Sequence, residues 1–216
     1  MRIIVTAGPT REAIDPVRFI SNRSTGKMGY AVARVCARRG HDVVLISGPV
    51  SIKPPRAVRT VKVVTADDML EAVKAGVSSC DVLIMTAAVS DFRPKTVSKG
   101  KIKKRSMPRS IPLVPTADIL TTMMPLKKDR IYVGFAAETS NVVKEAARKL
   151  KGKKLDLIVA NDVTRRDSGF GTDTNKVMFL SADGAVKRFP VMTKDQVAGR
   201  ILDWVEKRKN VASENA

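Results

Sequence analysis

Glycine and hydroxyl residues near the N-terminus form a pattern that can bind an anion. Gly8 follows the apolar, β-branched segment Arg2–Thr6, and Ser24, Gly26 and Lys27 stand directly before an amphipathic helical pattern. The first N–H groups of a helix are unpaired and carry a partial positive charge, and glycine lets a phosphate approach them. The pattern predicts a phosphate site. It matches neither a Walker A loop nor GxGxxG, so an ordinary capped turn is the alternative.

Two further polar residues, Arg18 and Asn22, lie in the stretch before this helix. Ligands of an open α/β sheet bind beyond the carboxyl ends of the strands, and this stretch follows such an end. A cation and an amide at the same sheet end favour a ligand site over a plain turn.

Small and acidic residues follow the next long apolar run, Asp81–Val89. Thr86 and Ala87 lie within its last part, and Asp91 comes just after it. Small side chains permit backbone contact with a flat ligand. A carboxylate accepts hydrogen bonds from an exocyclic amine or a ribose hydroxyl, or contacts a metal. The alternative is an aspartate that caps a turn or a helix.

The segment Ser90–Val114 interrupts the rhythm of the chain, because it is too long and too polar for an ordinary βα loop. From Arg93 to Arg109 it holds eight Lys and Arg residues and no acid. Lys101 and Lys103 alternate with an isoleucine as in a strand, which would point both lysines to one side. We expect a basic flap that closes over phosphates. A solvated face or a nucleic-acid-binding face is the alternative.

Three residues later in the chain extend the pattern. Phe135, near the end of another apolar run, can pack on a base or belong to the core. Lys149 and Lys153 are four residues apart, so they share one face if the helix continues and can hold a polyphosphate together. Solvated lysines are the alternative. Asn161 follows a further apolar run at the same predicted sheet edge.

Apolar periodicity alternates between strands and helices, which predicts a doubly wound, mostly parallel, Rossmann-like α/β sheet. Apolar residues between positions 28 and 36 recur at helical period, with Gly40 as a stop, and uninterrupted apolar runs are typical of buried parallel strands. We expect a C-terminal hairpin of Lys176–Leu180 and Val186–Pro190. The other expected strands are Arg2–Thr6, Asp42–Ser47, Val58–Val64, Asp81–Val89, Ile131–Ala137 and Leu155–Ala160. The expected helices, after the first, are Ala66–Val77, Thr116–Met124, Asn141–Lys151 and Lys194–Lys207.

Composition excludes several classes of protein. The 216 residues are 44% hydrophobic and 28% charged, which is typical of a globular chain. A single histidine, His41, leaves no His-based triad and no HExxH zinc site. Two cysteines, Cys36 and Cys80, make no disulfide framework and fit a reducing cytoplasm. The N-terminus enters a strand pattern at once, and no apolar run approaches the roughly 20 residues of a membrane helix, so we expect neither a signal peptide nor membrane insertion.

The formal net charge of +19 predicts anionic partners. Aromatic residues make up only 4% of the chain, and binders of single-stranded nucleic acid need aromatic platforms. Nucleic acid is therefore a disfavoured partner. The residues predict an enzyme for phosphorylated, nucleotide-like ligands, which works by positioning and by cationic stabilisation rather than by a histidine base. A nucleotide-dependent oxidoreductase and a basic nucleic-acid-binding protein are the alternatives.

The motifs TAGPTREAIDPVRFISNRSTGKMGYAVA, TAAVSDFRP, KIKK, ADIL, VGFAAET and DLIVAND occur in this order. Together they closely resemble the phosphopantothenate–cysteine ligase family over nearly the whole chain, up to about residue 208. In many relatives this ligase is joined to a flavin-dependent decarboxylase. We expect a free-standing ligase that uses no flavin, forms a single domain over residues 1–210 and ends in a disordered tail, 211–216. A separate decarboxylase is a possible partner.

The resemblance implies ligation of 4′-phosphopantothenate to L-cysteine in coenzyme A biosynthesis. CTP, rather than ATP, would activate the acid as an acyl-cytidylate and release pyrophosphate, and the cysteine amine would displace CMP. The residues offer no protein-borne metal cage, so Mg²⁺ would arrive with the nucleotide phosphates. Family members are typically homodimers in which the flap completes the site across the interface, so we expect a homodimer.

The resemblance also implies roles for single residues. Asn22 would hold the acyl carbonyl, with Arg18 nearby, and Lys101 would serve nucleotide phosphate and the developing charge. The glycine and helix-start pattern described above, rather than the resemblance, assigns Gly8, Ser24, Gly26 and Lys27 to substrate or phosphate binding. Where relatives often have proline, this chain has Ala117, which leaves the ADIL loop less rigid. The expected nucleotide contacts, besides Lys101, are Met85, Thr86, Ala87, Asp91, Ala117, Asp118, Ile119, Leu120, Phe135, Lys149 and Lys153.

Overall fold

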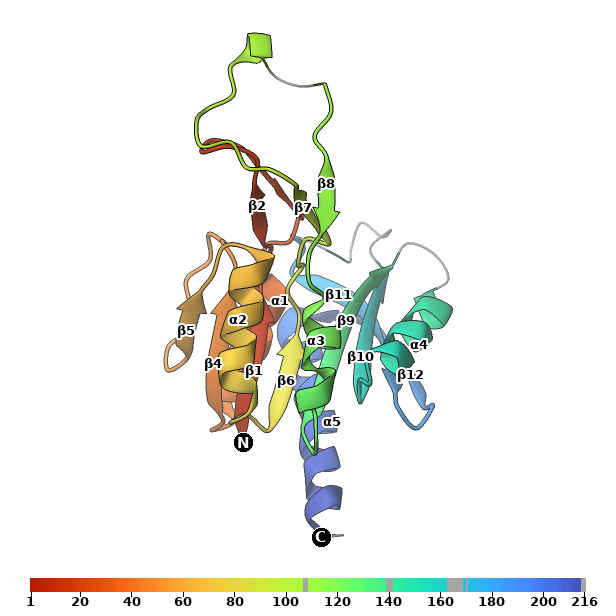
Figure 1. Ribbon diagram of the computed structural model, residues 1–216. Coiled ribbons are helices and arrows are strands. Elements are labelled where there is room, and N and C mark those ends of the chain that lie inside the picture. The colour runs from red at the N-terminus through yellow and green to blue at the C-terminus, as the bar shows by residue number, and fades with distance from the viewer. Residues whose placement is uncertain (107–108, 139–141, 163–168, 170, 215–216) are drawn as a thin grey trace.

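The computed structural model describes residues 1–106, 109–138, 142–162, 169 and 171–214. Its main sheet has the strand order β12-β11-β10-β9-β6-β1-β4-β5, and Figure 1 shows helices packed against it. The strands from β5 to β10 are parallel, whereas β11 runs antiparallel to both β10 and β12. The strands are β1 (Arg2–Ala7), β4 (Asp42–Ser47), β5 (Arg59–Lys62), β6 (Val82–Met85), β9 (Ile131–Glu138), β10 (Leu157–Asp162), β11 (Thr174–Ser181) and β12 (Val186–Thr193).

This arrangement confirms the predicted doubly wound, mostly parallel sheet with a C-terminal hairpin. The chain moves outward from β1 to β5 on one side, then returns to β6 on the other side of β1 and moves outward again. The direction of winding therefore reverses between β1 and β6, and α/β folds bind ligands at that point.

Helices cover both faces of the sheet. One core layer joins β1 residues such as Ile3 and Val5 to α1 (Lys27–Arg38) and α5 (Lys194–Glu214). The other joins Ile4 to α2 (Ala66–Val77), α3 (Ile119–Met123) and α4 (Val142–Gly152). Consecutive strand residues point to opposite faces, so a buried strand must be apolar throughout. A 3₁₀ turn, Met124–Leu126, follows α3.

Helix α2 has the bounds that the periodicity predicts, and a capping box fixes its start. Thr65 Oγ1 accepts a hydrogen bond from the Asp68 amide at 3.0 Å, and Asp68 Oδ2 accepts from the Thr65 amide at 2.9 Å. Helix α5, by contrast, continues through Glu214, past the predicted end at Lys207. It therefore includes residues 211–214 of the expected tail, and residues 215–216 lie outside the described part of the chain.

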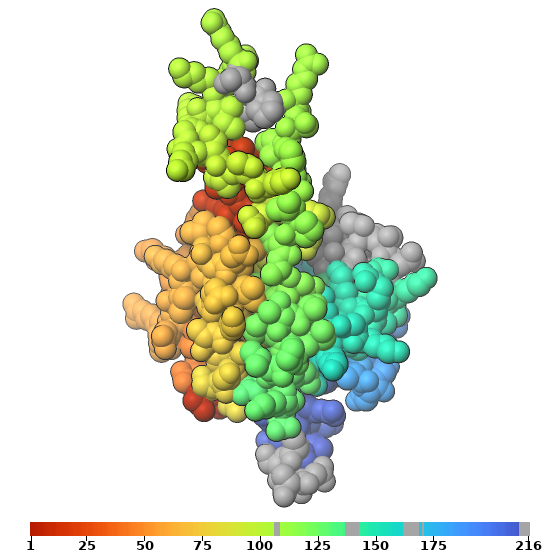
Figure 2. All heavy atoms as spheres, in the orientation of Figure 1, coloured from red at the N-terminus to blue at the C-terminus, as the bar shows by residue number. Residues whose placement is uncertain are grey.

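A small arm projects from the carboxyl-end edge of the sheet (Figures 1 and 2). It pairs β2 (Arg11–Ala13) with β3 (Phe19–Ser21), and β7 (Phe92–Pro94) with β8 (Leu113–Pro115), both antiparallel. The flap, residues 90–114, thus begins and ends in strands and carries a 3₁₀ turn at Lys104–Ser106; residues 107–108 are not described. The sequence gives little signal for these three-residue strands, because each is too short to show a period.

Several predictions about local structure are wrong. Helix α3 begins at Ile119 rather than Thr116, because Asp118 caps it. Residues 101–103 form no strand, because the N–H and C=O of Ile102 bond to side chains of the β2–β3 hairpin. Strand β6 ends at Met85 rather than Val89. There the Thr86 hydroxyl donates to the Thr6 carbonyl at 2.6 Å and the Ala87 amide donates to Thr6 Oγ1 at 3.2 Å, which replaces ladder bonds with side-chain bonds.

Candidate active site

A cleft of about 440 Å³ opens where the carboxyl ends of β1 and β6 meet the N-terminus of α1. Residues from both halves of the chain line it, as expected for a site at the reversal of winding. Fifteen of the predicted site residues are among them: Asn22, Ser24, Gly26, Lys27, Met85, Thr86, Ala87, Asp91, Ala117, Asp118, Ile119, Leu120, Phe135, Lys149 and Lys153.

The N-terminus of α1 forms one end of this cleft. Gly26, the residue before the helix, has φ 78°, and no side chain caps the helix there. Gly26, Lys27 and Met28 line the cleft, and the first N–H groups of a helix have no partner within the helix, so the first turn of α1 is suited to bind an anion there. Gly29 permits this approach, because a Cβ at that position would lie 2.4 Å from Thr86 Oγ1 and 2.5 Å from Ala7 Cβ.

Gly8 lies behind the cleft rather than in its lining. Its φ is 77°, a Cβ there would lie 2.9 Å from Val50 Cγ1, and its carbonyl accepts a hydrogen bond from the Ala88 amide at 2.9 Å. The predicted phosphate contact of Gly8 is therefore absent from this cleft. Gly8 instead shapes the turn that supports the loop after β6, because only glycine adopts such a φ freely.

Asn22 joins the loop before α1 to the loop after β6. Its Nδ2 donates to the carbonyl oxygens of Ala88 at 3.0 Å and Val89 at 3.1 Å. Two carbonyl acceptors require the amide nitrogen on that side, which leaves the amide oxygen as the atom able to accept from a ligand. Asn22 is thus held at the cleft by the backbone it supports.

Lys27 lies on one side of the cleft, and its partner Asp173 lines a second hollow beside it. The Lys27 ammonium forms an ion pair with Asp173 Oδ1 at 2.7 Å and donates to the Gly171 carbonyl at 2.8 Å. The hydrogen bond and the charge of Lys27 hold the pKa of Asp173 below its ordinary value. With Lys194, the first residue of α5, these residues form what we call the α1–α5 wall.

Asp118, Lys149 and Lys153 form the α3–α4 wall. Asp118 caps α3 by accepting a hydrogen bond from the Thr121 amide at 3.1 Å, and its other oxygen pairs with Lys153 at 2.8 Å. Desolvation acts to raise the pKa of Asp118, but hydrogen bonds from Lys153 and Thr121 together with the charge of Lys153 outweigh it and lower the pKa. Lys149 lines the cleft beside them.

Apolar atoms separate the two walls. Phe135 packs against the core layer of α1 and α5 and also lines the cleft, so its core contact is confirmed and its contact with a base stays a prediction. Ile119 is buried, and Leu120 packs against the opposite core layer. A flat ligand could rest on this surface, with Asp91 at its rim.

Arg18 and Lys101 do not line the cleft of their own chain. Arg18 pairs with the buried Asp15 at 3.2 Å and donates to the Ile102 carbonyl at 2.5 Å, so it fastens the flap to the β2–β3 hairpin. Desolvation acts to raise the pKa of Asp15, but amide hydrogen bonds from Val17, Ile102 and Arg18, with the charge of Arg18, lower it. Lys101 is exposed on the arm.

Asn175 and Lys194 line the cleft but escaped prediction, and so did Gly169 and Gly171. Asn161, noted from its place after an apolar run, also lines it. One signal for Lys194 exists in the sequence. A lysine opening a helix opposes the helix dipole, so its presence suggests another purpose.

Cysteine and histidine take no part in the cleft. Cys36 and Cys80 are buried, and desolvation raises the pKa of the two thiols to about 12 and about 11. His41 bonds to Glu206 of α5 at 3.0 Å. Within the described ranges, no group of three His, Cys, Asp or Glu residues could hold a metal ion.

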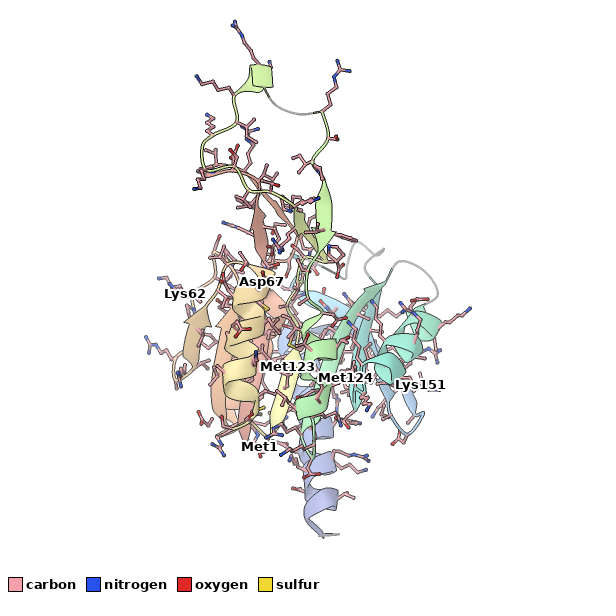
Figure 3. The ribbon with its side chains drawn as sticks, in the orientation of Figure 1. Met1, Lys62, Asp67, Met123, Met124 and Lys151 are labelled. Carbon is pink, nitrogen blue, oxygen red and sulfur yellow. The ribbon has the colours of Figure 1, made fainter. Side chains whose placement is uncertain are left out.

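The excess positive charge is spread beyond the cleft. In Figure 3, Lys62 on β5 and Lys151 on α4 lie on opposite sides of the body, and both are exposed. Some of the charge is paired: Arg39 bonds to Asp203 and Glu206 on α5, and Lys127 bonds to Asp156 at 3.0 Å. Nothing in the structure explains the remaining charge. Among the helices that the structure describes, none is both long and apolar enough to cross a membrane.

A family model described as the DNA/pantothenate metabolism flavoprotein C-terminal domain matches residues 1–209. The chain belongs to this family. It is 49% identical over 204 residues to the coenzyme A biosynthesis bifunctional protein CoaBC of Bacillus subtilis (strain 168), covering 94% of this chain and 50% of that protein. It is 45% identical over 212 residues to CoaBC of Escherichia coli (strain K12), covering 96% of this chain and 52% of that protein.

Solved structures agree with this membership in the flavoprotein C-terminal domain family. The crystal structure of the C-terminal domain of CoaBC matches with a TM-score of 0.83 and 45% identity, covering 97% of this chain and 95% of that one. The chain spans about half the length of the curated relatives that it matches.

Proposed function

We propose that this chain joins 4′-phosphopantothenate to L-cysteine through an acyl-cytidylate, as a step of coenzyme A biosynthesis. The observation that carries the proposal is a single cleft with lysines on two separate walls. One wall has Lys27, whose partner Asp173 lines the adjoining hollow, and the other has Lys153 paired with Asp118. A reaction between two phosphorylated substrates needs two such cationic places. The kinship to coenzyme A biosynthesis proteins over almost the whole chain supports the same reaction.

The chemistry proceeds in two steps. A carboxylate oxygen of phosphopantothenate attacks the α-phosphorus of CTP, the bond to the β-phosphate oxygen breaks, and pyrophosphate leaves. The cysteine amine then attacks the acyl carbon, the carbon–oxygen bond to CMP breaks, and the amine loses a proton. The first step brings two anions together and the second releases CMP as an anion, so fixed cations lower both barriers without a histidine base.

The α3–α4 wall would bind the nucleotide, and the α1–α5 wall the phosphorylated acid. Lys149 and Lys153 would face the triphosphate, while the first turn of α1 and Lys27 would face the phosphate monoester. The apolar surface between the walls, with Phe135, would carry the base or the pantoyl group. Because both hydrogens of Asn22 Nδ2 are engaged, the acyl carbonyl would replace one of the two backbone carbonyls as acceptor.

Magnesium enters this proposal as part of the nucleotide substrate. Of the two predicted nucleotide-contact carboxylates in the cleft, Asp118 is already paired with Lys153, which leaves Asp91 as the one open to a cation. A single carboxylate fits a Mg²⁺ that keeps its phosphate and water ligands. We propose no flavin for this reaction.

We propose further that two copies of the chain associate through the arm. The arm exposes apolar side chains that a monomer would leave in water: Val17 is 58% exposed, Phe19 47%, Phe92 51%, Val97 50% and Leu113 47%. Figure 2 shows the arm standing away from the body, so it can reach a second copy. Lys101, fastened by Arg18, would then serve the cleft of its partner.

The proposal is tested by incubating the protein with phosphopantothenate, cysteine, Mg²⁺ and either CTP or ATP. Pyrophosphate release that is faster with CTP is the expected result, and no release with either nucleotide contradicts the function. Titration with NAD(P)H and salt-dependent binding of DNA or RNA examine the alternative classes.

The Asn22→Asp variant tests the proposed second step. A carboxylate at this position would place oxygen against the carbonyls of Ala88 and Val89, which repels the loop and removes the donor. We expect transfer to cysteine to fall more than pyrophosphate release. Equal losses in both steps would contradict the role assigned to Asn22 in transfer to cysteine.

Lys101→Gln tests the arm. We expect it to lower the rate strongly, and mixed dimers with a cleft-defective Lys153 variant should regain activity if the flap acts on the partner's cleft. An unchanged rate would contradict this role and indicate that the flap lysines only form a solvated surface.

A further inference from the structure

Lys194 is a buried lysine between two hollows, and the proposed reaction leaves it without a role. It is 7% exposed, it lines the cleft, and it also lines a second hollow of about 330 Å³ that shares Lys27 with the cleft. Its ammonium donates to the carbonyl oxygens of Gly169 at 3.2 Å and Thr174 at 3.3 Å, and to the side-chain oxygen of Asn175. All three acceptors are neutral.

The charged groups around Lys194 do not neutralise it. Among the described residues no carboxylate forms an ion pair with it, because Asp173 pairs with Lys27, and Asp195 pairs with Arg34 and Arg38. Desolvation and the repulsion of Lys27 lower the pKa of Lys194 to about 8, against a smaller opposing effect of Asp173. Lys53, in the second hollow, adds a further positive charge.

A buried cation without a counter-ion is costly, and a protein gains when a ligand supplies the missing charge. The uncapped N-terminus of α1 and Lys27 lie at the same end of the cleft, and both favour an anion as well. The α1–α5 wall, defined by Lys27, Lys194 and Asp173, therefore carries a net formal charge of one positive unit when Lys194 is protonated.

We propose that Lys194 completes a binding site for a phosphate monoester in the α1–α5 wall. Its three hydrogens are donated to the protein, so it acts on the phosphate as a fixed nearby charge. It also holds Asn175 and the backbone of residues 169 and 174, which shape this side of the cleft. That the natural ligand is the phosphate of the acid substrate, rather than of the nucleotide, rests on the proposed function.

The site has a pH signature. Protonated Lys194 attracts the phosphate, and as pH rises through the pKa of about 8 that charge is lost, so affinity falls. A phosphate monoester is already mostly a dianion above its second pKa of about 6, so its own charge changes little in this range. Bound phosphate should in turn raise the pKa of Lys194, so affinity falls from the free-protein pKa of about 8 up to the higher pKa of the complex.

The experiment measures binding of a phosphate monoester, glycerol 3-phosphate, and of CTP, separately, by calorimetry on the full chain. We compare wild type with Lys194→Met, with Lys194→Arg, which keeps the charge, and with Lys207→Met, an exposed lysine on the same helix. Lys194→Met should weaken phosphate binding about tenfold or more at pH about 7 and leave CTP binding nearly unchanged, since the second site is farther from the lost charge. Lys207→Met should match wild type.

Wild type should lose phosphate affinity between about pH 7 and about pH 9.5, and Lys194→Met should not. Unchanged phosphate binding in Lys194→Met, or an equal loss for phosphate and CTP, overturns the proposal. Should Lys194→Met not fold, a flat pH profile of phosphate binding in wild type overturns it as well. Failure of pyrophosphate release in wild type would instead remove the proposed function, and the phosphate titrations would still decide the role of Lys194.

Discussion

The two walls of the cleft have similar charges but different construction. In the α3–α4 wall, Lys153 and its partner Asp118 have side chains 29% and 45% exposed. In the α1–α5 wall, the Asp173 side chain is 86% exposed, whereas Lys194 is almost completely buried. One wall thus has a single, partly enclosed ion pair, and the other has a hydrated aspartate paired with Lys27 and a second, buried lysine that has no ion pair among the described residues.

This difference determines what each wall can offer a ligand. Water screens the charge of the exposed Asp173. Asp173 therefore reduces only slightly the attraction that Lys27 and Lys194 exert on an anionic ligand. Asp118 is more enclosed and competes more directly with a nucleotide for Lys153. The α1–α5 wall should therefore act as a standing anion site. The α3–α4 wall should release its lysine to the phosphates only when the nucleotide arrives.

The largest expected effect comes from Lys153→Met. It removes the cation and also leaves Asp118 uncompensated, facing the triphosphate, so we expect kcat/KM for CTP to fall about a hundredfold. Initial-rate measurements with varied CTP check this. Lys154→Met, an exposed lysine outside the cleft lining, is the control. If Lys153→Met instead raised only the KM for phosphopantothenate, the nucleotide and the phosphorylated acid would have to be assigned to the opposite walls.

Lys27→Met should have a smaller effect in the other wall. The carboxylate that it frees, Asp173, is hydrated, and Lys194 still supplies charge, so we expect KM for phosphopantothenate to rise about tenfold. The measurement is a titration of that substrate at saturating CTP. If Lys27→Met matched Lys153→Met in its effect on CTP, the walls would not be separate sites.

Asp118→Asn should change the nucleotide step less. Asparagine also caps a helix, so α3 keeps its hydrogen bond from Thr121 while Lys153 gains freedom to meet the phosphates. We expect CTP to bind equally well or a few-fold more tightly by calorimetry, as a few-fold change is about the size of one weak ion pair. Weaker binding would mean that Asp118 contacts the nucleotide directly.

The smallest expected effect concerns stability in acid. The folded-state pKa of Asp118 is lowered, so its contribution is present above the unfolded pKa and is lost as pH falls through the folded value. Urea unfolding of wild type and Asp118→Asn should therefore converge below about pH 3. Asp173→Asn should differ little from wild type at any pH, because that side chain is hydrated. Equal behaviour of the two variants would contradict the contrast between the walls.

Much of the cleft follows from local sequence. The carboxyl ends of parallel strands meet at one edge, so residues such as Asn22, Thr86 and Phe135 could be assigned to one site before the fold was known. Lys149 and Lys153 follow from helical spacing in the same way. The helix bounds of α2 agree with prediction because a capping box and an apolar period act within a dozen residues.

Other features depend on contacts between distant segments. Arg18 and Lys101 lie on the arm, outside the cleft of their own chain, because Asp15 and Ile102 bind Arg18 there. Gly8 supports the loop after β6 through Val50 and Ala88, which no local pattern reveals. Asn175 and Lys194 reach the cleft only because β11 reverses direction beside β10.

The sequence alone determined the alternation of strands and helices, the presence of a single histidine and the set of polar residues at strand ends, since each depends on residue type and short spacing. The tertiary structure alone decided which charges are paired, which are buried and which face one another. Coulomb interactions and desolvation depend on distance and solvent exposure in space, so the contrast between Lys153 beside Asp118 and Lys194 among neutral acceptors appears only once the chain has folded.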